Sequence, residues 1–225
     1  MELYNSRSRF KLLEVLVSIT NISLQLYLLL RIWPLSIGVG WQMLSLLAAY
    51  VVTDFANGLV HMFMDSCDRY DSPVGPLIAN FHLHHKVPQY RRHSLPVVYF
   101  TESGSKNWLV GYLLALLFLT GVPGVSHTVL YVLLYVGILS SVAEVSHYLC
   151  HSSTSPTVDF LGKTGLLLSK RHHAKHHLQD NSNYAFLNGC TDPLLNQIAA
   201  YFCKGYKSNT DLHYAQYDGL DSDDR

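Results

Sequence analysis

The sequence predicts an all-α integral membrane protein with four transmembrane helices and a cytoplasmic cap of short helices that carries a histidine-rich di-metal site. Three observations predict this fold class: long apolar stretches, basic residues that fall on one side of those stretches, and 13 histidines that gather in groups. The chain is 49% hydrophobic and only 14% charged. No internal repeat or linker marks a second domain, so we expect residues 1–225 to form a single domain.

Four apolar stretches define the expected spans. Residues 41–61 and 129–150 approach the roughly 20 residues that a helix needs to cross a bilayer. Residues 108–122 are shorter but strongly apolar, and they end at a Pro-Gly turn. Residues 15–33 carry several polar side chains and are followed by no early cleavage site of the small-x-small kind. We therefore expect residues 15–33 to be a retained helix rather than a signal peptide.

The basic residues test this arrangement of spans. Three precede the first span, five lie between the second and third, and seven follow the fourth, so 15 of the 16 Lys and Arg residues share one side and Arg31 alone lies opposite. The positive-inside rule then places both termini, residues 62–107 and residues 151–225 in the cytoplasm, at a membrane of the endoplasmic reticulum or of a bacterium. The acidic tail, about residues 216–225, is expected to be disordered. No pattern points to nucleic acid, and the oligomeric state is open.

Most of the histidines lie next to the cytoplasmic ends of the second and fourth spans. Imidazole binds iron, copper, zinc and nickel, and residues three or four apart on a helix share a face. Seven or more converging ligands exceed what one zinc ion takes, which favours two metal ions. Residues 170–177 could instead form a basic surface patch, and His82 is as consistent with a surface role as with metal binding. We expect His127 and His213 not to be ligands. The candidate metal ligands are His61, His84, His85, His93, His147, His151, His172, His173, His176 and His177.

Carboxylates accompany these histidines along the same helix faces. Asp54, Asn57, His61 and Asp65 follow one face of the second span, from the middle of the membrane to its cytoplasmic edge. Ionisable residues inside a membrane usually face a bundle interior and mark function, although Asp54 and Asn57 could simply bind neighbouring helices. Asp65 and Glu144 are the catalytic candidates. Both, together with Asp54, are expected to be carboxylates that orient imidazoles, and Asp65 could itself bind metal.

Taken in order, these motifs resemble one family of membrane enzymes. The chain from about residue 50 to 200 is similar to the Kua-type lipid desaturases, which include plasmanylethanolamine desaturases and plastid palmitate desaturases. The resemblance implies a membrane di-iron enzyme that holds two non-haem Fe ions and introduces a double bond into a lipid chain. It also implies O2 as co-substrate and an electron donor such as cytochrome b5 or ferredoxin. The motifs that carry it are Asp54-Phe-Ala-Asn-Gly-Leu-Val-His61 with Asp65, Phe81-x2-His84-His85 followed by Arg92-His93, His147-x3-His151, and Lys170-Arg171-His172-His173-x2-His176-His177.

Two alternatives follow from the same residues. A lipid hydroxylase would use the same ligand spacing, because the outcome depends on how a substrate radical is partitioned. A metal-binding membrane transporter or sensor would place ligands along a path across the bilayer, and only His127 lies on the expected outer side. The family's acidic, glycine-rich run after the third histidine group is matched only in part, by Glu102, Gly104 and Asn107. The resemblance therefore implies the class of reaction rather than the lipid.

Overall fold

The computed structural model describes residues 8–67, 69–72, 75–86, 93–179 and 181–203, and every regular element in these residues is a helix. The predicted acidic tail and His213 lie outside them. The elements in chain order are α2 (Ser8–Ile32), α3 (Val39–Ser66), α4 (Gly75–Lys86), α5 (Leu95–Glu102), the 3-10 turn η1 (Ser103–Ser105), α6 (Asn107–Leu119), α7 (His127–Ser152), α8 (Pro156–Lys163), α9 (Lys170–Leu178) and α10 (Asp192–Phe202).

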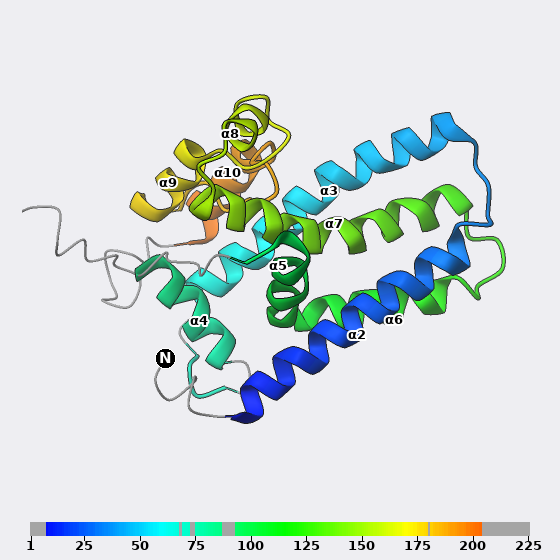
Figure 1. Ribbon diagram of the computed structural model, residues 1–225, viewed down its shortest axis with the longest axis horizontal. Coiled ribbons are helices and arrows are strands. Elements are labelled where there is room, and N and C mark those ends of the chain that lie inside the picture. The colour runs from blue at the N-terminus through cyan, green and yellow to red at the C-terminus, as the bar shows by residue number, and fades with distance from the viewer. Residues whose placement is uncertain (1–7, 68, 73–74, 87–92, 180, 204–225) are drawn as a thin grey trace, which may run out of the picture.

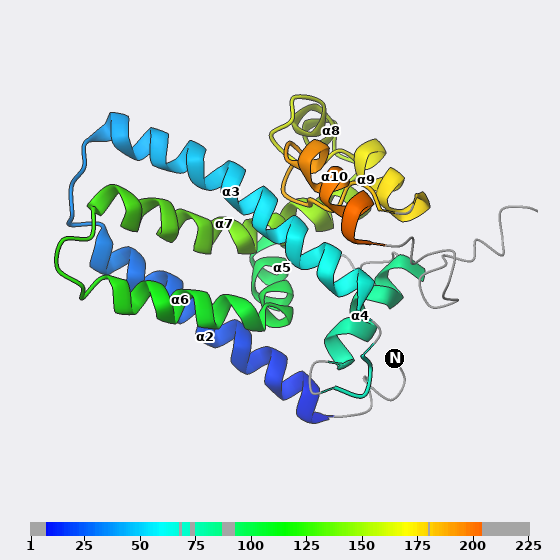
Figure 2. The same cartoon turned by 180° about the vertical axis from the view of Figure 1, so that it is seen from behind.

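The molecule is elongated, with a bundle at one end and short helices at the other (Figure 1). Helices α2, α6 and α7 pack against one another, and α3 packs along α7. The short helices α4, α8, α9 and α10 gather where α3 and α7 end, and α5 crosses between the two halves, as both views show (Figure 2). The end of the bundle that carries the histidine motifs is therefore the end covered by the short helices.

Three helices are long and apolar enough to cross a membrane: Lys11–Ile32, Val39–Ser66 and His127–Ser152. The fourth expected span, residues 108–122, forms α6, whose 13 residues are apolar but short. At 1.5 Å per residue α6 extends about 20 Å, less than the roughly 30 Å of a hydrocarbon core. Just before α6, η1 packs against α2, and the chain enters α6 part of the way along that helix.

The bundle exposes large apolar side chains and buries several polar ones, as expected of helices that lie in a membrane. Leu30 and Phe118 are each 75% exposed, whereas Asn21 and Gln25 are buried. Asn21 Nδ2 donates to the Ser103 carbonyl at 3.1 Å, and Gln25 Nε2 donates to the Gly137 carbonyl at 2.9 Å. The amide groups of Asn21 and Gln25, which weaken residues 15–33 as an apolar stretch, therefore donate hydrogen bonds to neighbouring parts of the bundle.

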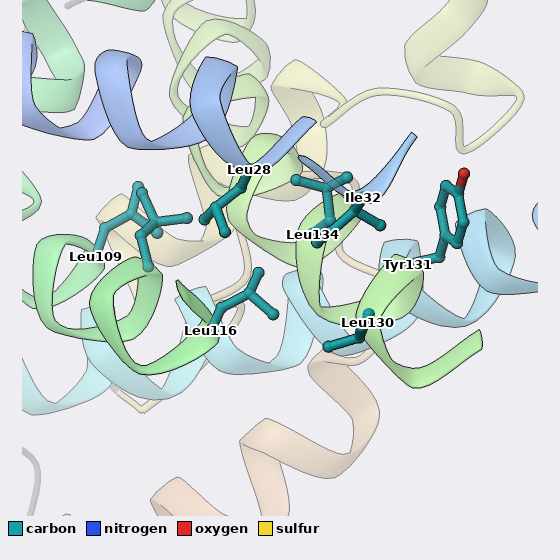
Figure 3. Packing of buried hydrophobic residues seen from close by; sticks show 8 residues of the cluster. Leu28, Ile32, Leu109, Leu116, Leu130, Tyr131 and Leu134 are labelled. Carbon is teal, nitrogen blue, oxygen red and sulfur yellow. The ribbon is translucent and has the colours of Figure 1, made fainter. Parts of the chain in front are cut away.

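An apolar cluster holds α2, α6 and α7 together at the end of the bundle away from the histidines (Figure 3). Closer to the histidines the contact between α2 and η1 is tight: a Cβ on Gly104 would lie 2.7 Å from the Glu14 carbonyl oxygen, so only glycine fits there. These contacts set the position of α7 and of the turn that precedes α6. The residues of the cluster are Leu28, Ile32, Leu109, Leu113, Leu116, Leu130, Tyr131 and Leu134.

Candidate metal centre

Two long helices bring the first histidines together. α3 ends at Ser66 and α7 ends at Ser152, and the two pack side by side over much of their length. His61 and Asp65 are one turn apart on α3, and His147 and His151 are one turn apart on α7. All four side chains are therefore directed into the space between the ends of α3 and α7, which the short helices cover.

The short helices α4 and α9 supply the remaining histidines. The adjacent residues His84 and His85 lie on neighbouring faces of α4, so they contribute to different groups. α9 begins after Ser169, whose hydroxyl accepts a hydrogen bond from the backbone N–H of His172 and caps the helix. His173, His176 and His177 form the buried face of α9.

The first group of side chains contains five histidines whose ring nitrogens lie within 4.8 Å of one another: His84, His147, His151, His173 and His177. The distance from Nε2 of His147 is 2.9 Å to Nε2 of His173 and 3.2 Å to Nε2 of His151. Nε2 of His84 lies 3.1 Å from Nε2 of His151, and Nε2 of His177 lies 3.0 Å from Nε2 of His173. We call these five residues the five-histidine group.

The second group contains three histidines and one carboxylate: His61, Asp65, His85 and His176. All four side chains are buried. The Asp65 oxygens lie 3.0 Å from Nε2 of His85, 3.3 Å from Nε2 of His176 and 3.4 Å from Nε2 of His61. Asp65 thus faces the same ring nitrogen of each histidine. We call these four residues the aspartate group.

The spacing of these atoms fits metal binding. Ligands at about 2.1 Å from a metal ion stand about 3.0–3.4 Å apart at neighbouring corners of an octahedron or tetrahedron. The contact distances given above for both groups, 2.9–3.4 Å, correspond to those edges. Two facing imidazole nitrogens can share at most one proton, so five of them converging cannot all be satisfied by hydrogen bonds to one another. A cation between them removes that conflict.

Hydrogen bonds to backbone carbonyls orient two rings of the aspartate group. Nδ1 of His61 donates to the Tyr184 carbonyl at 2.8 Å, and Nδ1 of His176 donates to the Ser182 carbonyl at 2.8 Å. With the proton on Nδ1, the lone pair of Nε2 is directed at Asp65 and its neighbours, as metal binding requires. Nothing in the side-chain pattern of residues 181–184 could have indicated these carbonyl contacts.

Burial favours the neutral form of four histidines of the short helices α4 and α9. Desolvation, followed by the charge of neighbouring imidazoles, holds the pKa of His84 and of His173 well below the ordinary value. The pKa of His176 is lowered well below that value by burial and then by His61, and the pKa of His177 is lowered by burial and then by His85. Neutral imidazole is the form that binds metal.

Two of the ten predicted ligands lie outside both groups. His93 is exposed, and its backbone N–H donates to the Tyr148 hydroxyl at 2.9 Å. Nε2 of His172 donates to the Asp192 carboxylate at 2.5 Å, and a Cβ on Gly189 would fall 2.5 Å from the same nitrogen. His172 therefore fixes the loop that follows α9.

Three further residues considered in the sequence analysis lie outside the two ligand groups. His82, which the sequence left open, hydrogen-bonds to Tyr70 and lies outside both groups. His127, predicted not to be a ligand, is exposed at the first residue of α7. Glu144 lies beside the five-histidine group, with Oε2 3.7 Å from Nδ1 of His147.

Asp54 serves a purpose that sequence reasoning missed. Its Oδ1 accepts from the backbone N–H groups of Asn188 and Gly189 at 3.0 and 3.1 Å. Its Oδ2 accepts from the N–H and hydroxyl of Thr191 at 3.0 and 2.8 Å. Asp54 therefore anchors the loop before α10 to α3, rather than orienting an imidazole. The partners lie more than 130 residues away in sequence, beyond the reach of any periodicity.

Comparison with known proteins agrees with this geometry. A family model for the lipid desaturase domain matches residues 50–203, a range that contains both groups. A curated relative, plasmanylethanolamine desaturase from Myxococcus xanthus, is 26% identical over 180 residues, a match that covers 76% of this chain and 62% of the relative. The chain thus covers less than two thirds of that relative's length. No solved structure matches the chain. Because the family model spans more than half of the sequence, this chain belongs to the lipid desaturase family.

Proposed function

We propose that this protein is a membrane-bound non-haem di-iron desaturase that introduces a double bond into a lipid hydrocarbon chain. The observation that carries the proposal is the pair of adjacent ligand groups within the lipid desaturase domain. One group offers five imidazole nitrogens, and the other offers three imidazoles and the Asp65 carboxylate. The five-histidine group offers more donors than a structural zinc ion takes, since such an ion is almost always four-coordinate, and imidazole also suits iron.

The proposed reaction needs an external oxidant and an electron donor. A CH2–CH2 unit of the lipid loses two hydrogen atoms and becomes CH=CH. O2 accepts four electrons, two from the lipid and two from a carrier protein such as a cytochrome b5 or a ferredoxin, and with two further protons leaves as two waters. No side-chain acid or base can remove hydrogen from an unactivated methylene, so bound iron would supply the oxidising chemistry.

The protein's own residues would orient the ligands and keep water away. The carbonyls of Tyr184 and Ser182 fix the rings of two histidines, as described above. The Phe186 ring lies 5.5 Å from the His61 ring and 5.6 Å from the His147 ring, so it contacts both groups. The Phe81 ring lies 5.6 Å from that of His61. Aromatic side chains at these places shield the site from solvent and leave an apolar environment for a hydrocarbon chain.

We further propose that α6, with α5 and η1, completes a four-segment membrane domain whose termini, five-histidine group and aspartate group face the cytoplasm. The basic asymmetry of the sequence supports this topology. Cysteine labelling should then find residues near 90 and near 180 on the side of the N-terminus and residue 125 on the other. Finding the 90 and 180 regions on opposite sides would contradict the shared site.

The function is tested by lipid analysis of cells that express the wild-type chain, grown in air. Desaturation yields a product that is lighter than its precursor by two hydrogens, whereas hydroxylation yields one that is heavier by one oxygen. His147→Ala should abolish the product and His176→Ala should do the same. His127→Ala, at the far end of α7, is the matched control and should retain it. A wild-type chain that holds one zinc and no iron, or that leaves every lipid unchanged, would contradict the proposal.

A further inference from the structure

A lysine lies buried beside the metal centre. Lys106 joins η1 to α6 and is only 4% exposed. Its Nζ donates to Glu144 Oε1 at 2.9 Å and to Asn57 Oδ1 at 2.8 Å, and lies 4.9 Å from the centre of the Phe186 ring. An ammonium group has three N–H donors, so two carry hydrogen bonds and the remaining one is available to the face of an aromatic ring.

The two hydrogen-bond acceptors occupy equivalent places in the two long helices. Asn57 precedes His61 by one turn of α3, and Glu144 precedes His147 by one turn of α7. A single ammonium group, that of Lys106, therefore binds both Asn57 and Glu144. Through these two residues it is linked to one histidine of each group. Phe186, the ring nearest Nζ, also contacts both of those histidines.

Glu144 is the direct link from Lys106 to the five-histidine group. One carboxylate oxygen receives the ammonium, and the other lies 3.7 Å from Nδ1 of His147. Nε2 of the same ring is directed at His173, 2.9 Å away. A carboxylate on the far nitrogen of a metal-binding imidazole fixes the orientation of the ring and makes it a better ligand.

We infer that Lys106 is a positioning residue of the metal centre, which holds the Glu144 carboxylate against His147 and fixes the end of α3 relative to that of α7. This inference rests on the proposed function, because it assumes that the five-histidine group binds metal. It assigns a role in the site to a residue that offers no metal ligand and that lies 41 positions before His147.

Removing the lysine has two separable consequences. Lys106→Met leaves the Glu144 carboxylate buried without its cationic partner. An uncompensated buried charge destabilises the fold. Lys106→Met combined with Glu144→Gln removes both charges, a change that is often nearly neutral for stability. Neither variant retains a carboxylate held against His147. The double variant therefore separates the positioning of the ring from the stability of the fold.

The experiment is a titration of the metal-free, full-length protein in detergent with Co²⁺, followed by the visible absorption of the bound ion, with thermal unfolding recorded in parallel. We expect Lys106→Met and the double variant to bind Co²⁺ about 10- to 100-fold more weakly at one site, with an altered spectrum. The control is Arg31→Met, since Arg31 also joins two helices, through a 2.7 Å hydrogen bond to Thr120, but at the other end of the bundle. It should bind Co²⁺ as the wild type does.

Each outcome decides one question. If the double variant unfolds at the wild-type temperature and binds Co²⁺ with wild-type affinity and spectrum, Lys106 does not position the metal ligands and the inference is wrong. If Lys106→Met fails to fold, the Co²⁺ affinity of the double variant alone tests the inference. A wild-type protein that binds no Co²⁺ would instead contradict the proposed function.

Discussion

Replacing Asp54 by asparagine should destabilise the protein without removing a metal ligand. The carboxylate accepts four hydrogen bonds from three residues of one loop, at 2.8–3.1 Å. In Asp54→Asn the amide oxygen can still accept from Asn188 and Gly189. The amide nitrogen, however, is a donor, and it would face the backbone N–H of Thr191 with no acceptor between them.

The size of the effect follows from the bonds lost. A hydrogen bond to a charged group contributes about 1.5–3 kcal/mol, so losing the two bonds at Oδ2 costs about 3–6 kcal/mol. For a chain of this length each kcal/mol shifts the midpoint of thermal unfolding by about 2–4 °C, which predicts a fall of at least about 6 °C. Thr191→Val removes the hydroxyl donor alone and should cost about half as much.

The assay compares thermal unfolding and iron content of the wild type, Asp54→Asn and Thr191→Val in the same detergent. We expect the midpoints to fall in that order of severity, Asp54→Asn lowest, while the folded fraction of each variant holds as much iron as the wild type. The reasoning is refuted if Asp54→Asn unfolds at the wild-type temperature and yet loses its iron, because Asp54 would then act on the ligands and not on the loop.

Three further variants test other parts of the structure. His93→Ala should keep metal and activity, because the side chain is exposed and lies outside both groups; loss of iron on elemental analysis would contradict this. His172→Ala should lower the unfolding temperature, because the ring binds the Asp192 carboxylate at 2.5 Å. It should keep the iron, because His172 lies outside both ligand groups; loss of iron would contradict this. Gly104→Ala should reduce the folded yield, since its Cβ would meet the Glu14 carbonyl oxygen at 2.7 Å; a normal yield in detergent extracts would show that α2 shifts freely.

Helical spacing sufficed to predict which histidines share a helix face, but not how they divide between two groups. His147 and His151, one turn apart, do enter the same group. His173, His176 and His177 form the buried face of α9, yet His173 and His177 join the five-histidine group and His176 joins Asp65. At 3.6 residues per turn, His177 is rotated from His173 by about 40° and His176 by about 60° in the opposite direction. The three rings therefore share one broad face, and the packing of α9 decides which group each ring enters.

The positions of the basic residues along the sequence did not predict which of them are buried. Lys106 counts among the basic residues of the expected cytoplasmic loop, but it is buried against Glu144 and Asn57. A lysine in a polar stretch of sequence is expected to be exposed to solvent. Its burial cannot be predicted when the residues that bind its ammonium group lie far away in the sequence. Residues 108–122 form a shorter helix than expected because α6 already ends at Leu119, where the backbone N–H groups of Gly121 and Val122 donate turn hydrogen bonds to the Phe118 and Leu119 carbonyls. Lys106 and the preceding turn hold the chain inside the bundle before α6 begins.

The two carboxylates of the site act on opposite nitrogens of the imidazole rings. Asp65 faces Nε2 atoms, where a metal would bind, and Glu144 faces Nδ1 of His147, on the far side of the ring, with Lys106 on its other oxygen. In the proposed centre one ion would therefore have an anionic ligand and the other only neutral ones. An anionic ligand favours the more highly charged form of an ion. Two irons in such unlike surroundings would be oxidised at different potentials, so Asp65→Asn should bring their potentials together.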